Sequence, residues 1–287
     1  MTTASAHALE PSNTPKRVSF FFAAHEDDWQ LFMNPPAFRD VLDEKARCVF
    51  VHVTAGDAGL GVGSGGRKHP YYLARENGAE TAIRFMADAN DRRPIDPTVS
   101  AISVAGHAIR RVGYRNTAAY FLRLPDGNPA GSGYADTGYQ SLQRLAKDEI
   151  DELSALDGTA RYRGWDDLTS TLRGIIDLER ERDLVVDFHV PDPDPGNNPD
   201  EHADHIFTAQ AALAAGKDLS ARWVHHLIYA SGNRPENLSA EDRDMKSAVY
   251  AVTLAGVLAL DHSVSWQRYD QLFVGRGYYR VEVGRRS

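Results

Sequence analysis

Two short segments of the sequence, far apart along the chain, combine histidine with carboxylates in patterns suited to metal binding. Residues 25–28 have the sequence HEDD, and residues 202–205 have the sequence HADH. A catalytic zinc ion is usually held by three protein ligands, and its fourth position stays open for water. His25 and Asp28 are close enough in sequence to converge on one ion, and the distant segment can supply the remaining ligand. The two segments together therefore predict one shared metal site.

Each of these segments follows a predicted buried strand. Residues 18–22 and residues 184–189 are short apolar runs with the sequences VSFFF and LVVDFH. Runs of this kind are typical of parallel strands that are covered on both faces of a sheet. In open α/β sheets, ligands bind beyond the carboxyl ends of the strands. Both segments are therefore expected at the same edge of one sheet, with His202 and His205 on one face of the helix predicted for residues 202–215.

The rest of the chain alternates between strand-like and helix-like patterns. Further strands are predicted at residues 47–54, 100–111, 117–124 and 224–229, and further helices at residues 28–33, 38–46, 71–88, 141–152, 166–181 and 240–259. This alternation favours an α/β fold in which a mostly parallel sheet is covered by helices on both faces. Residues 265–283 alternate aromatic with polar side chains, which predicts a small β addition at the C-terminal end. We expect residues 17–287 to form a single domain, preceded by a flexible N-terminal tail at residues 1–16.

The composition restricts the class of protein and its partners. Hydrophobic residues make up 42% of the chain and aromatic residues 9%, as expected for a globular protein with a large core. The formal net charge of −8 and the lack of a basic run argue against nucleic acid or an anionic membrane as a partner. The sequence has no stretch typical of a membrane span or a signal peptide, so a cytoplasmic location is expected. Cys48, the one cysteine, excludes an intramolecular disulfide and is expected to be buried.

The two segments resemble the signature of a known family, the LmbE-like (PIG-L) zinc-dependent N-acetylglucosaminyl deacetylases. That signature has an AHxDD motif after the first strand and a distal HxxH motif, which correspond here to AHEDD at residues 24–28 and to HADH. Three further segments resemble the family's second strand, following helix and mid-chain loop, namely residues 53–59, Arg75-Glu76 and residues 124–127. The likeness extends over residues 18–214. It departs from the family pattern at Glu26, where proline is usual, and we expect this change to alter loop stiffness or pocket charge.

The resemblance implies a Rossmann-like fold, a cofactor and a set of binding residues. His25, Asp28 and His205 would bind Zn²⁺. Nitrogen and oxygen ligands of this kind also suit other divalent transition metals. Arg75 and Asp126 would contact the substrate.

The resemblance also implies a reaction, the hydrolysis of a linear amide C–N bond that removes an acyl group from the nitrogen of an amino sugar or its glycoside. The simplest such acyl group is acetyl. Asp27 would act as the general base, and His202 would stabilise the oxyanion or protonate the leaving amine. The chemistry is physically reasonable, because a metal ion activates water, a carboxylate accepts the proton, and a charged imidazole donates to the oxyanion. Asp27 is expected to remain free beside the ion while Asp28 binds it.

Two other functions remain open at this point. A protein that binds a metal or a sugar without turnover would carry the same residues, and each segment alone is also typical of a polar helix start. Residues 61–66 contain a GxGxxG string, which raises the alternative of a dinucleotide-binding Rossmann protein. The string is separated from the preceding strand, and no acidic residue stands where a ribose would need one. We therefore interpret these glycines as a lip over the pocket.

Several candidate residues also have a simpler structural interpretation. Arg75 could pair with carboxylates across a helix surface, and Asp126 could form only a turn with the glycine that follows it. Asp57 could orient a metal-binding histidine or cap a turn. The adjacent His225 and His226 are expected to be packing residues.

Overall fold

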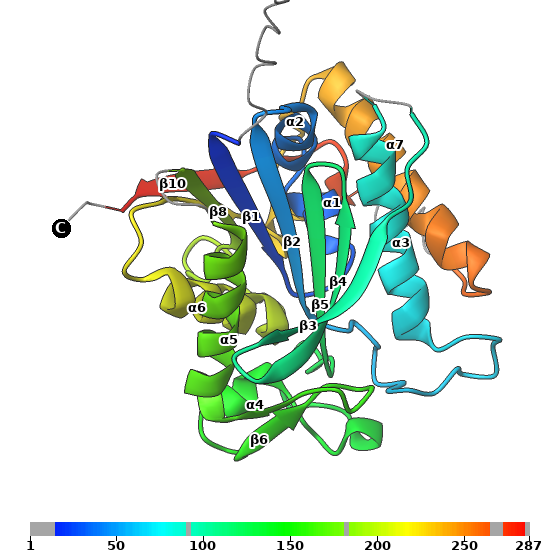
Figure 1. Cartoon of the computed structure of the whole chain (residues 1–287), viewed down its shortest axis with the longest axis vertical. Helices are drawn as coiled ribbons and strands as arrows, with labels where there is room; N and C mark the ends of the chain where they lie inside the picture. Colours follow the sequence, from blue (N-terminus) through cyan, green and yellow to red (C-terminus); the bar gives the residue numbers. More distant parts are fainter. Residues whose placement is uncertain (1–14, 90–92, 181–183, 265–271, 285–287) are drawn as a thin grey trace, which may run out of the picture.

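A computed structural model describes residues 15–89, 93–180, 184–264 and 272–284 of the chain (Figure 1). Within these residues, eight strands form a central sheet in the order β10-β9-β8-β1-β2-β5-β4-β3. The strands are β1 Arg17–Ala23, β2 Ala46–Thr54, β3 Thr98–Val104, β4 His107–Tyr114, β5 Thr117–Leu124, β8 Val185–Pro191, β9 Arg222–His226 and β10 Tyr279–Val283. Strands β9, β8, β1, β2 and β5 are parallel, whereas β10 is antiparallel to β9, β4 to β5, and β3 to β4. The predicted mostly parallel sheet is therefore confirmed.

Helices cover both faces of this sheet (Figure 1). One face carries α1 Asp28–Phe32, α2 Pro36–Leu42, α3 Tyr71–Ala87 and α7 Ala240–Ala259, and the other carries α4 Leu142–Ala146, α5 Gly164–Glu179 and α6 Ala203–Gly216. Phe20 and Phe22 of β1 pack in the core beneath α4 to α6, while Phe21 packs in the opposite core. Successive side chains of a strand point to opposite faces, so a strand covered on both sides needs apolar residues in succession. This packing explains the uninterrupted phenylalanines before the HEDD segment.

One predicted strand proves to be two. The sequence favoured a single strand over residues 100–111, but β3 and β4 form an antiparallel hairpin. Ala105 and Gly106 at its turn have φ values of 49° and 90°. Positive φ at both central residues is typical of two-residue hairpin turns. The turn escaped prediction because alanine at its first position is not a usual turn signal.

The chain also departs from the predictions at α4 and at β9. The helix predicted for residues 141–152 is shortened to α4, and the chain then forms a small hairpin of β6 Glu152–Ser154 and β7 Arg161–Arg163. Strand β9 ends at His226, and a 3-10 turn, η2 Tyr229–Asn233, follows it. The earlier end of β9 matters for function, because it moves Tyr229 out of the sheet.

The ends of the chain were predicted in part. Residues 1–14 of the expected tail lie outside the described residues, whereas the backbone N–H of Lys16 already donates to the carbonyl of Lys45. The expected C-terminal β addition is β10, which pairs with β9. It is shorter than predicted, and residues 265–271 of that prediction lie outside the described residues. Across the described chain, we find no helix with the length and apolar character that a membrane crossing requires.

The strand order brings the chemically interesting loops to one edge of the sheet. His25 follows the carboxyl end of β1, Asp57 that of β2, and Asp126 that of β5. The loop after β8 leads into α6 at the same edge. Because the carboxyl ends of parallel strands share an edge, segments distant in sequence can build one site there.

Candidate metal centre and catalytic site

Three ligand atoms from the two predicted segments converge at this edge. Nε2 of His205 lies 3.2 Å from Nδ1 of His25 and 3.1 Å from Oδ1 of Asp28, and the last two atoms are 3.7 Å apart. Ligands bound to a tetrahedral zinc ion at roughly 2.0–2.1 Å lie about 3.3 Å from one another. All three side chains are buried. Their donor types and spacing therefore fit a divalent transition metal.

The junction between β1 and α1 fixes two of these ligands. The backbone N–H of His25 donates to Oδ2 of Asp28 at 2.8 Å, which leaves Oδ1 for the histidines. Asp28 is also the first residue of α1, where the helix dipole favours a carboxylate. His205 comes from the first turn of α6, so its position depends on how that helix begins.

Two carboxylates that the sequence patterns did not single out hold the ligand histidines in orientation. Oε1 of Glu201 lies 2.6 Å from Nδ1 of His205, and Oδ2 of Asp204 lies 3.4 Å from Nε2 of His25. Each histidine thus has a carboxylate at the ring nitrogen that faces away from the other ligands. Such partners fix the ring and raise its basicity as a ligand. The spacing of Glu201, four residues before His205, was the available signal.

Replacing Glu201 with glutamine is expected to weaken metal affinity by about 10–100-fold. The substitution keeps the size of the side chain but removes the negative charge that supports His205. The affinity can be measured by competition with a chromogenic chelator. Glu241→Gln, on the exposed first turn of α7, is the matched control and should leave the affinity unchanged. Equal affinities for the two variants would show that Glu201 does not support the site.

The charges of the ligand groups depend on one another. Burial disfavours a charged Asp28, but His205 and His25 lower its pKa well below the usual value. Burial also disfavours charged histidines, yet Asp28 and Glu201 raise the pKa of His205 to about 9. In the same way, Asp28 and Asp204 outweigh burial and raise the pKa of His25 well above its usual value. In the metal-free protein these shifts favour protonation of the histidines, and a metal must compete with the proton for their ring nitrogens.

Metal affinity is therefore expected to fall as the pH falls. Below the His205 pKa of about 9, each pH unit should cost at least about tenfold in affinity, because a protonated ring nitrogen cannot bind the ion. The raised pKa of His25 acts in the same direction and steepens the dependence. Zinc affinity measured by chelator competition at about pH 6, 7 and 8 checks the slope. An affinity that does not change over this range would contradict the assignment of these histidines as ligands.

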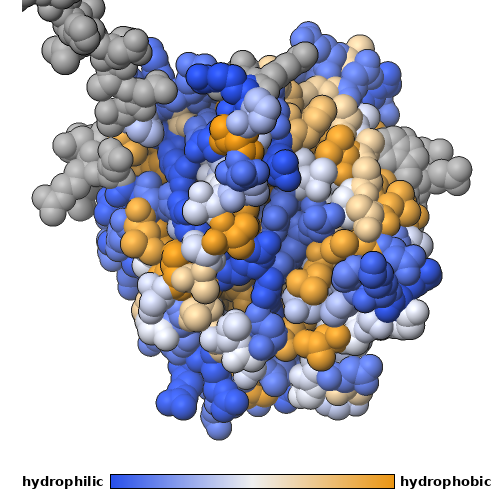
Figure 2. Space-filling model, turned by 45° about the vertical axis from the view of Figure 1, so that its right-hand side comes forward, coloured by the Kyte–Doolittle hydropathy of each residue, from blue (hydrophilic) through white to orange (hydrophobic). Residues whose placement is uncertain are grey.

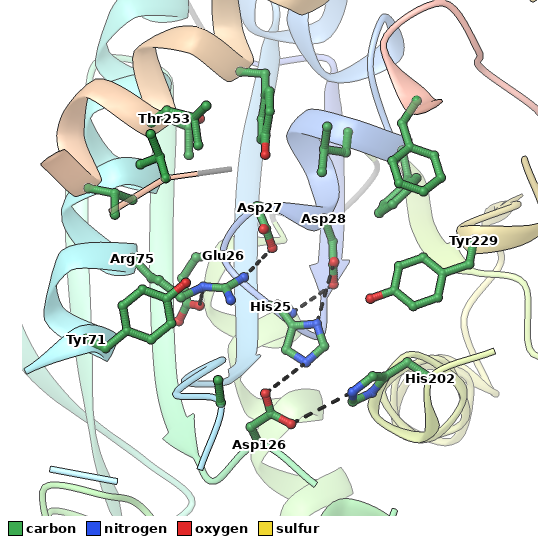
Figure 3. A pocket seen from close by; sticks show the side chains of 18 of the residues that line it. His25, Glu26, Asp27, Asp28, Tyr71, Arg75, Asp126, His202, Tyr229 and Thr253 are labelled. Atoms are coloured by element: carbon green, nitrogen blue, oxygen red, sulfur yellow. Dashed lines mark hydrogen bonds and ion pairs between the residues drawn. The ribbon is translucent and has the colours of Figure 1, made fainter. Parts of the chain in front are cut away.

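The structure brings all the predicted site residues to one place (Figure 3). The lining of a cavity of about 680 Å³ includes six of them, namely His25, Asp27, Asp28, Arg75, Asp126 and His202. His205 is fully buried beside them. A volume of this size is typical of pockets for small organic ligands.

No family model matches the chain, and no curated protein matches its sequence. Among solved structures, the chain resembles N,N'-diacetylchitobiose deacetylase from Pyrococcus horikoshii in complex with its inhibitor MPG, with a TM-score of 0.50 and 13% sequence identity. The likeness covers 93% of this chain and 84% of the deacetylase chain. At this identity, the comparison establishes a shared α/β fold.

Asp27 is not free, in contrast to the expectation. Arg75 of α3 forms an ion pair with Oδ1 of Asp27, and its Nε lies 3.1 Å from Oε2 of Glu26. A further nitrogen of Arg75 donates to the carbonyl of Gly56 at 3.1 Å. The Asp27 side chain keeps 30% of its surface exposed, so it faces the cavity as well as Arg75 (Figure 3). Arg75 is thus placed to hold Asp27 in one orientation.

Glu26, where the resembled family usually has proline, adds a buried carboxylate to this group. Burial raises the pKa of Glu26 to about 8, although the charge of Arg75 opposes the shift. Gly56 leaves the space that this packing needs. A Cβ atom at this glycine would lie 2.8 Å from Arg75 and 2.9 Å from Glu26, and its φ of +49° also favours glycine. The change at Glu26 therefore places a buried polar carboxyl group beside the pocket.

His202 occupies the N-cap position of α6. Its Nδ1 accepts the backbone N–H of Asp204 at 3.2 Å, so a neutral ring carries its proton on Nε2. That nitrogen lies 3.8 Å from Oδ1 of Asp126. Burial and the charges of His25 and His205 lower the pKa of His202 to about 2. The structure thus favours a neutral N–H donor in place of the expected charged imidazole.

A second group of side chains also lies within metal-binding range. It consists of His25, Asp126, His202 and Asp204. Its atoms are more widely spaced, with Nε2 of His25 lying 3.4 Å from Asp204 and 4.0 Å from Asp126. This group uses the ring nitrogen of His25 that otherwise faces a supporting carboxylate. The more compact set of His25, Asp28 and His205 is therefore the better candidate.

Asp126 and Asp57 stabilise the loops around the cavity. Oδ1 of Asp126 accepts the backbone N–H of Asn128 at 2.8 Å, which is the predicted turn, while the same side chain also lines the cavity. Asp57 accepts backbone N–H groups from Asp126 at 2.8 Å and Gly61 at 2.7 Å. It therefore joins the loops after β2 and β5, and these contacts match the turn-capping interpretation.

Two other features of the sequence lie apart from the site. The glycine string at residues 61–66 lies in a loop, and α3 begins only at Tyr71, so the string does not form a strand-to-helix phosphate turn. Its residues do not line the cavity, which gives no support to the predicted lip. His225 and His226 are buried, and Nε2 of His226 lies 2.9 Å from Nδ1 of His189 in the sheet. This contact agrees with a packing role.

Proposed function

We propose that the protein is a metal-dependent amidohydrolase of the LmbE-like (PIG-L) type, which removes an N-acyl group, most simply acetyl, from an amino sugar or its glycoside. The observation that carries this proposal is the convergence of His25, Asp28 and His205 at distances suited to one zinc ion. Asp27 and His202 lie beside this set in the same cavity. The fold shared with a diacetylchitobiose deacetylase supports the proposal.

Asp27 is the proposed general base. A zinc ion held by the three ligands would act as a Lewis acid and lower the pKa of a bound water to about 7. Asp27 accepts one proton of the attacking water while the water oxygen bonds to the acyl carbon, and it later delivers that proton to the nitrogen as the C–N bond breaks, so the products are a carboxylic acid, which then ionises in solvent, and a free amine. Because Arg75 holds one oxygen of Asp27, the carboxylate is oriented before substrate arrives. Such pre-positioning reduces the entropy cost of the reaction.

His202 is the proposed oxyanion donor. The backbone N–H of Asp204 occupies its Nδ1, which leaves the Nε2 proton to donate to the oxygen that becomes negative. A neutral imidazole can stabilise the oxyanion without losing its proton. The fixed N-cap position of His202 therefore favours oxyanion stabilisation over protonation of the amine.

Arg75 and Asp126 are the proposed substrate contacts. Both line the cavity near His25, with Arg75 next to Asp27 and Asp126 below the His25 ring in the view of Figure 3. The carboxylate of Asp126 can accept hydrogen bonds from sugar hydroxyl groups. Arg75 already pairs with two carboxylates, so it would contact the substrate through guanidinium N–H groups that these pairs do not use.

The proposal is tested by measuring metal content together with acyl release. The purified protein is stripped with a chelator, reloaded with one equivalent of zinc, cobalt or manganese, and assayed with a panel of N-acetylglucosaminides. Release of acetate and free amine that depends on the added metal is the expected result. Stoichiometric metal without hydrolysis of any amide in the panel would favour a binding protein without turnover. A nucleotide absorbance in the purified protein, with no bound metal, would favour the dinucleotide alternative.

A further inference from the structure

The cavity has two halves of different character. Around His25, Asp126 and His202 its lining is polar and charged (Figure 3). The other half has an apolar wall made of Leu31, Phe32, Tyr250, Leu254, Val257, Val264, Leu272 and Phe273. On the outer surface in Figure 2, by contrast, hydrophobic side chains form several separate patches among hydrophilic ones. An amino sugar presents hydroxyl groups, and the charged partners for them lie in the first half, whereas Thr253 and Ser263 add only two hydroxyl groups beside the apolar wall.

The apolar wall is a packed structure that reaches the metal ligands. Phe32 and Phe273 lie edge to face, with ring centroids 4.9 Å apart, and Tyr229 stacks on Phe273 at 6.2 Å. The ring of Tyr229 also lies 5.2 Å from the ring of His205. Aromatic pairs with this geometry stabilise one another beyond simple burial. The wall is therefore pre-formed and adjoins the place where the amide would react.

Most of the apolar wall comes from a part of the chain that lies outside the family resemblance. The family resemblance ends near Ala214, whereas α7 supplies Tyr250, Leu254 and Val257, and the segment after it supplies Leu272. Leu272 is 43% exposed although it lines the cavity. Exposed apolar surface in a cavity is unfavourable in water and is stabilised when an apolar ligand covers it.

We propose that the apolar wall binds an apolar substituent of the substrate, either an acyl chain longer than acetyl or an apolar aglycone next to the reacting amide. This inference rests on the proposed amidohydrolase function and adds the class of its substrate. The aliphatic side chains of the wall cannot hydrogen-bond a second sugar ring. They gain free energy only by covering hydrocarbon, and each methylene that they bury should raise kcat/KM about fourfold.

A substrate series separates the two sources of hydrocarbon. The zinc-loaded protein is assayed with N-acetylglucosamine, its hexyl glycoside, N-hexanoylglucosamine and N,N'-diacetylchitobiose. We expect at least about a tenfold higher kcat/KM for the hexyl glycoside or the N-hexanoyl compound than for N-acetylglucosamine. A gain for the hexyl glycoside would show that the wall binds the aglycone, and a gain for the N-hexanoyl compound would show that it binds the acyl chain. If N,N'-diacetylchitobiose shows a gain in kcat/KM as large as the better of the two apolar compounds, the wall accepts a sugar and the proposal is overturned.

Variants of the wall test whether it causes the preference. The preference is expressed as kcat/KM for the hexyl or hexanoyl compound divided by kcat/KM for N-acetylglucosamine. Leu254→Asn and Leu272→Asn should each reduce this ratio by at least about fivefold. Leu258→Asn is the matched control, because Leu258 lies on the same helix, is 54% exposed and does not line the cavity. That variant should keep the wild-type ratio. An unchanged ratio in both wall variants would overturn the proposal.

Binding measurements keep this inference separate from the proposed reaction. If the zinc-loaded protein hydrolyses none of these compounds, the amidohydrolase proposal fails. Calorimetric titration then compares the hexyl glycoside and N-hexanoylglucosamine with N-acetylglucosamine. At least about tenfold tighter binding of either apolar compound, lost in Leu254→Asn, would still support the apolar wall as a ligand site. Equal affinities would reject it.

Discussion

Replacing Asp27 with asparagine is expected to lower kcat by about 10²–10⁴-fold while the protein keeps one equivalent of metal. Asparagine has nearly the same shape, but it cannot accept the proton of the attacking water. Asp27 lies outside the set of three converging ligand atoms, so the metal should stay bound. The change thus removes a chemical step and leaves the binding site in place.

The neighbouring carboxylate provides the comparison for this result. Asp28→Asn should lose metal as well as activity, because Oδ1 of Asp28 lies 3.1 Å from the ligand nitrogen of His205. Metal content by elemental analysis and acetate release by a coupled assay are measured on both variants. If Asp27→Asn retains wild-type activity, Asp27 is not the base. If neither variant nor the wild type turns over substrate, the protein is a binder.

Replacing His205 with alanine is expected to abolish stoichiometric zinc binding and to lower activity by about a thousandfold or more. Nε2 of His205 lies 3.2 Å from the ligand nitrogen of His25 and 3.1 Å from the ligand oxygen of Asp28. Removing His205 therefore leaves only two ligands. Two protein ligands do not provide the three that catalytic zinc sites normally use.

His202→Ala is the matched variant from the same HADH segment. It should keep the metal and lower kcat by about 10²–10³-fold, as expected for loss of one oxyanion donor. Metal content and kcat are measured for both variants under the same loading conditions. Loss of metal in His202→Ala with retention in His205→Ala would instead support the wider group of His25, Asp126, His202 and Asp204 as the ion site.

The sheet and the meeting of the two segments could be predicted because each depends on local sequence. The phenylalanines of β1 lie between two helical layers, so burial on both faces left a continuous apolar run before His25. Strand β8 has the same character before the loop that leads to His202. Parallel strands present their carboxyl ends at one edge, so proximity followed from topology without any knowledge of side-chain packing.

The partners of the ligands could not be predicted in the same way. Asp204 lies inside the HADH segment, but its distance to His25 depends on where α6 sits against β1. The pair of Arg75 with Asp27 likewise depends on how α3 packs near the end of β1. Such contacts come from packing between elements, and a single sequence does not specify them. For this reason, the sequence did not predict the ion pair that holds Asp27 in one orientation.

The apolar wall was missed for a different reason. Leu254 and Val257 follow the helical spacing of α7, and residues with that spacing are as typical of a core as of a pocket. Tyr229 was expected to end a strand, whereas η2 places it beside the cavity. Apolar residues show how a helix is oriented, but they do not show whether protein or ligand covers them.

The position of the candidate ligands also has a consequence for the whole molecule. Asp28 and His205 are 177 residues apart in the chain and come from helices on opposite faces of the sheet. An ion held between them would act as a non-covalent cross-link, because it would close a very long loop as a disulfide does. An ion that binds only the folded arrangement would raise the free energy of unfolding, and the increase would grow with the logarithm of the ion concentration. Chelation would then lower the melting temperature.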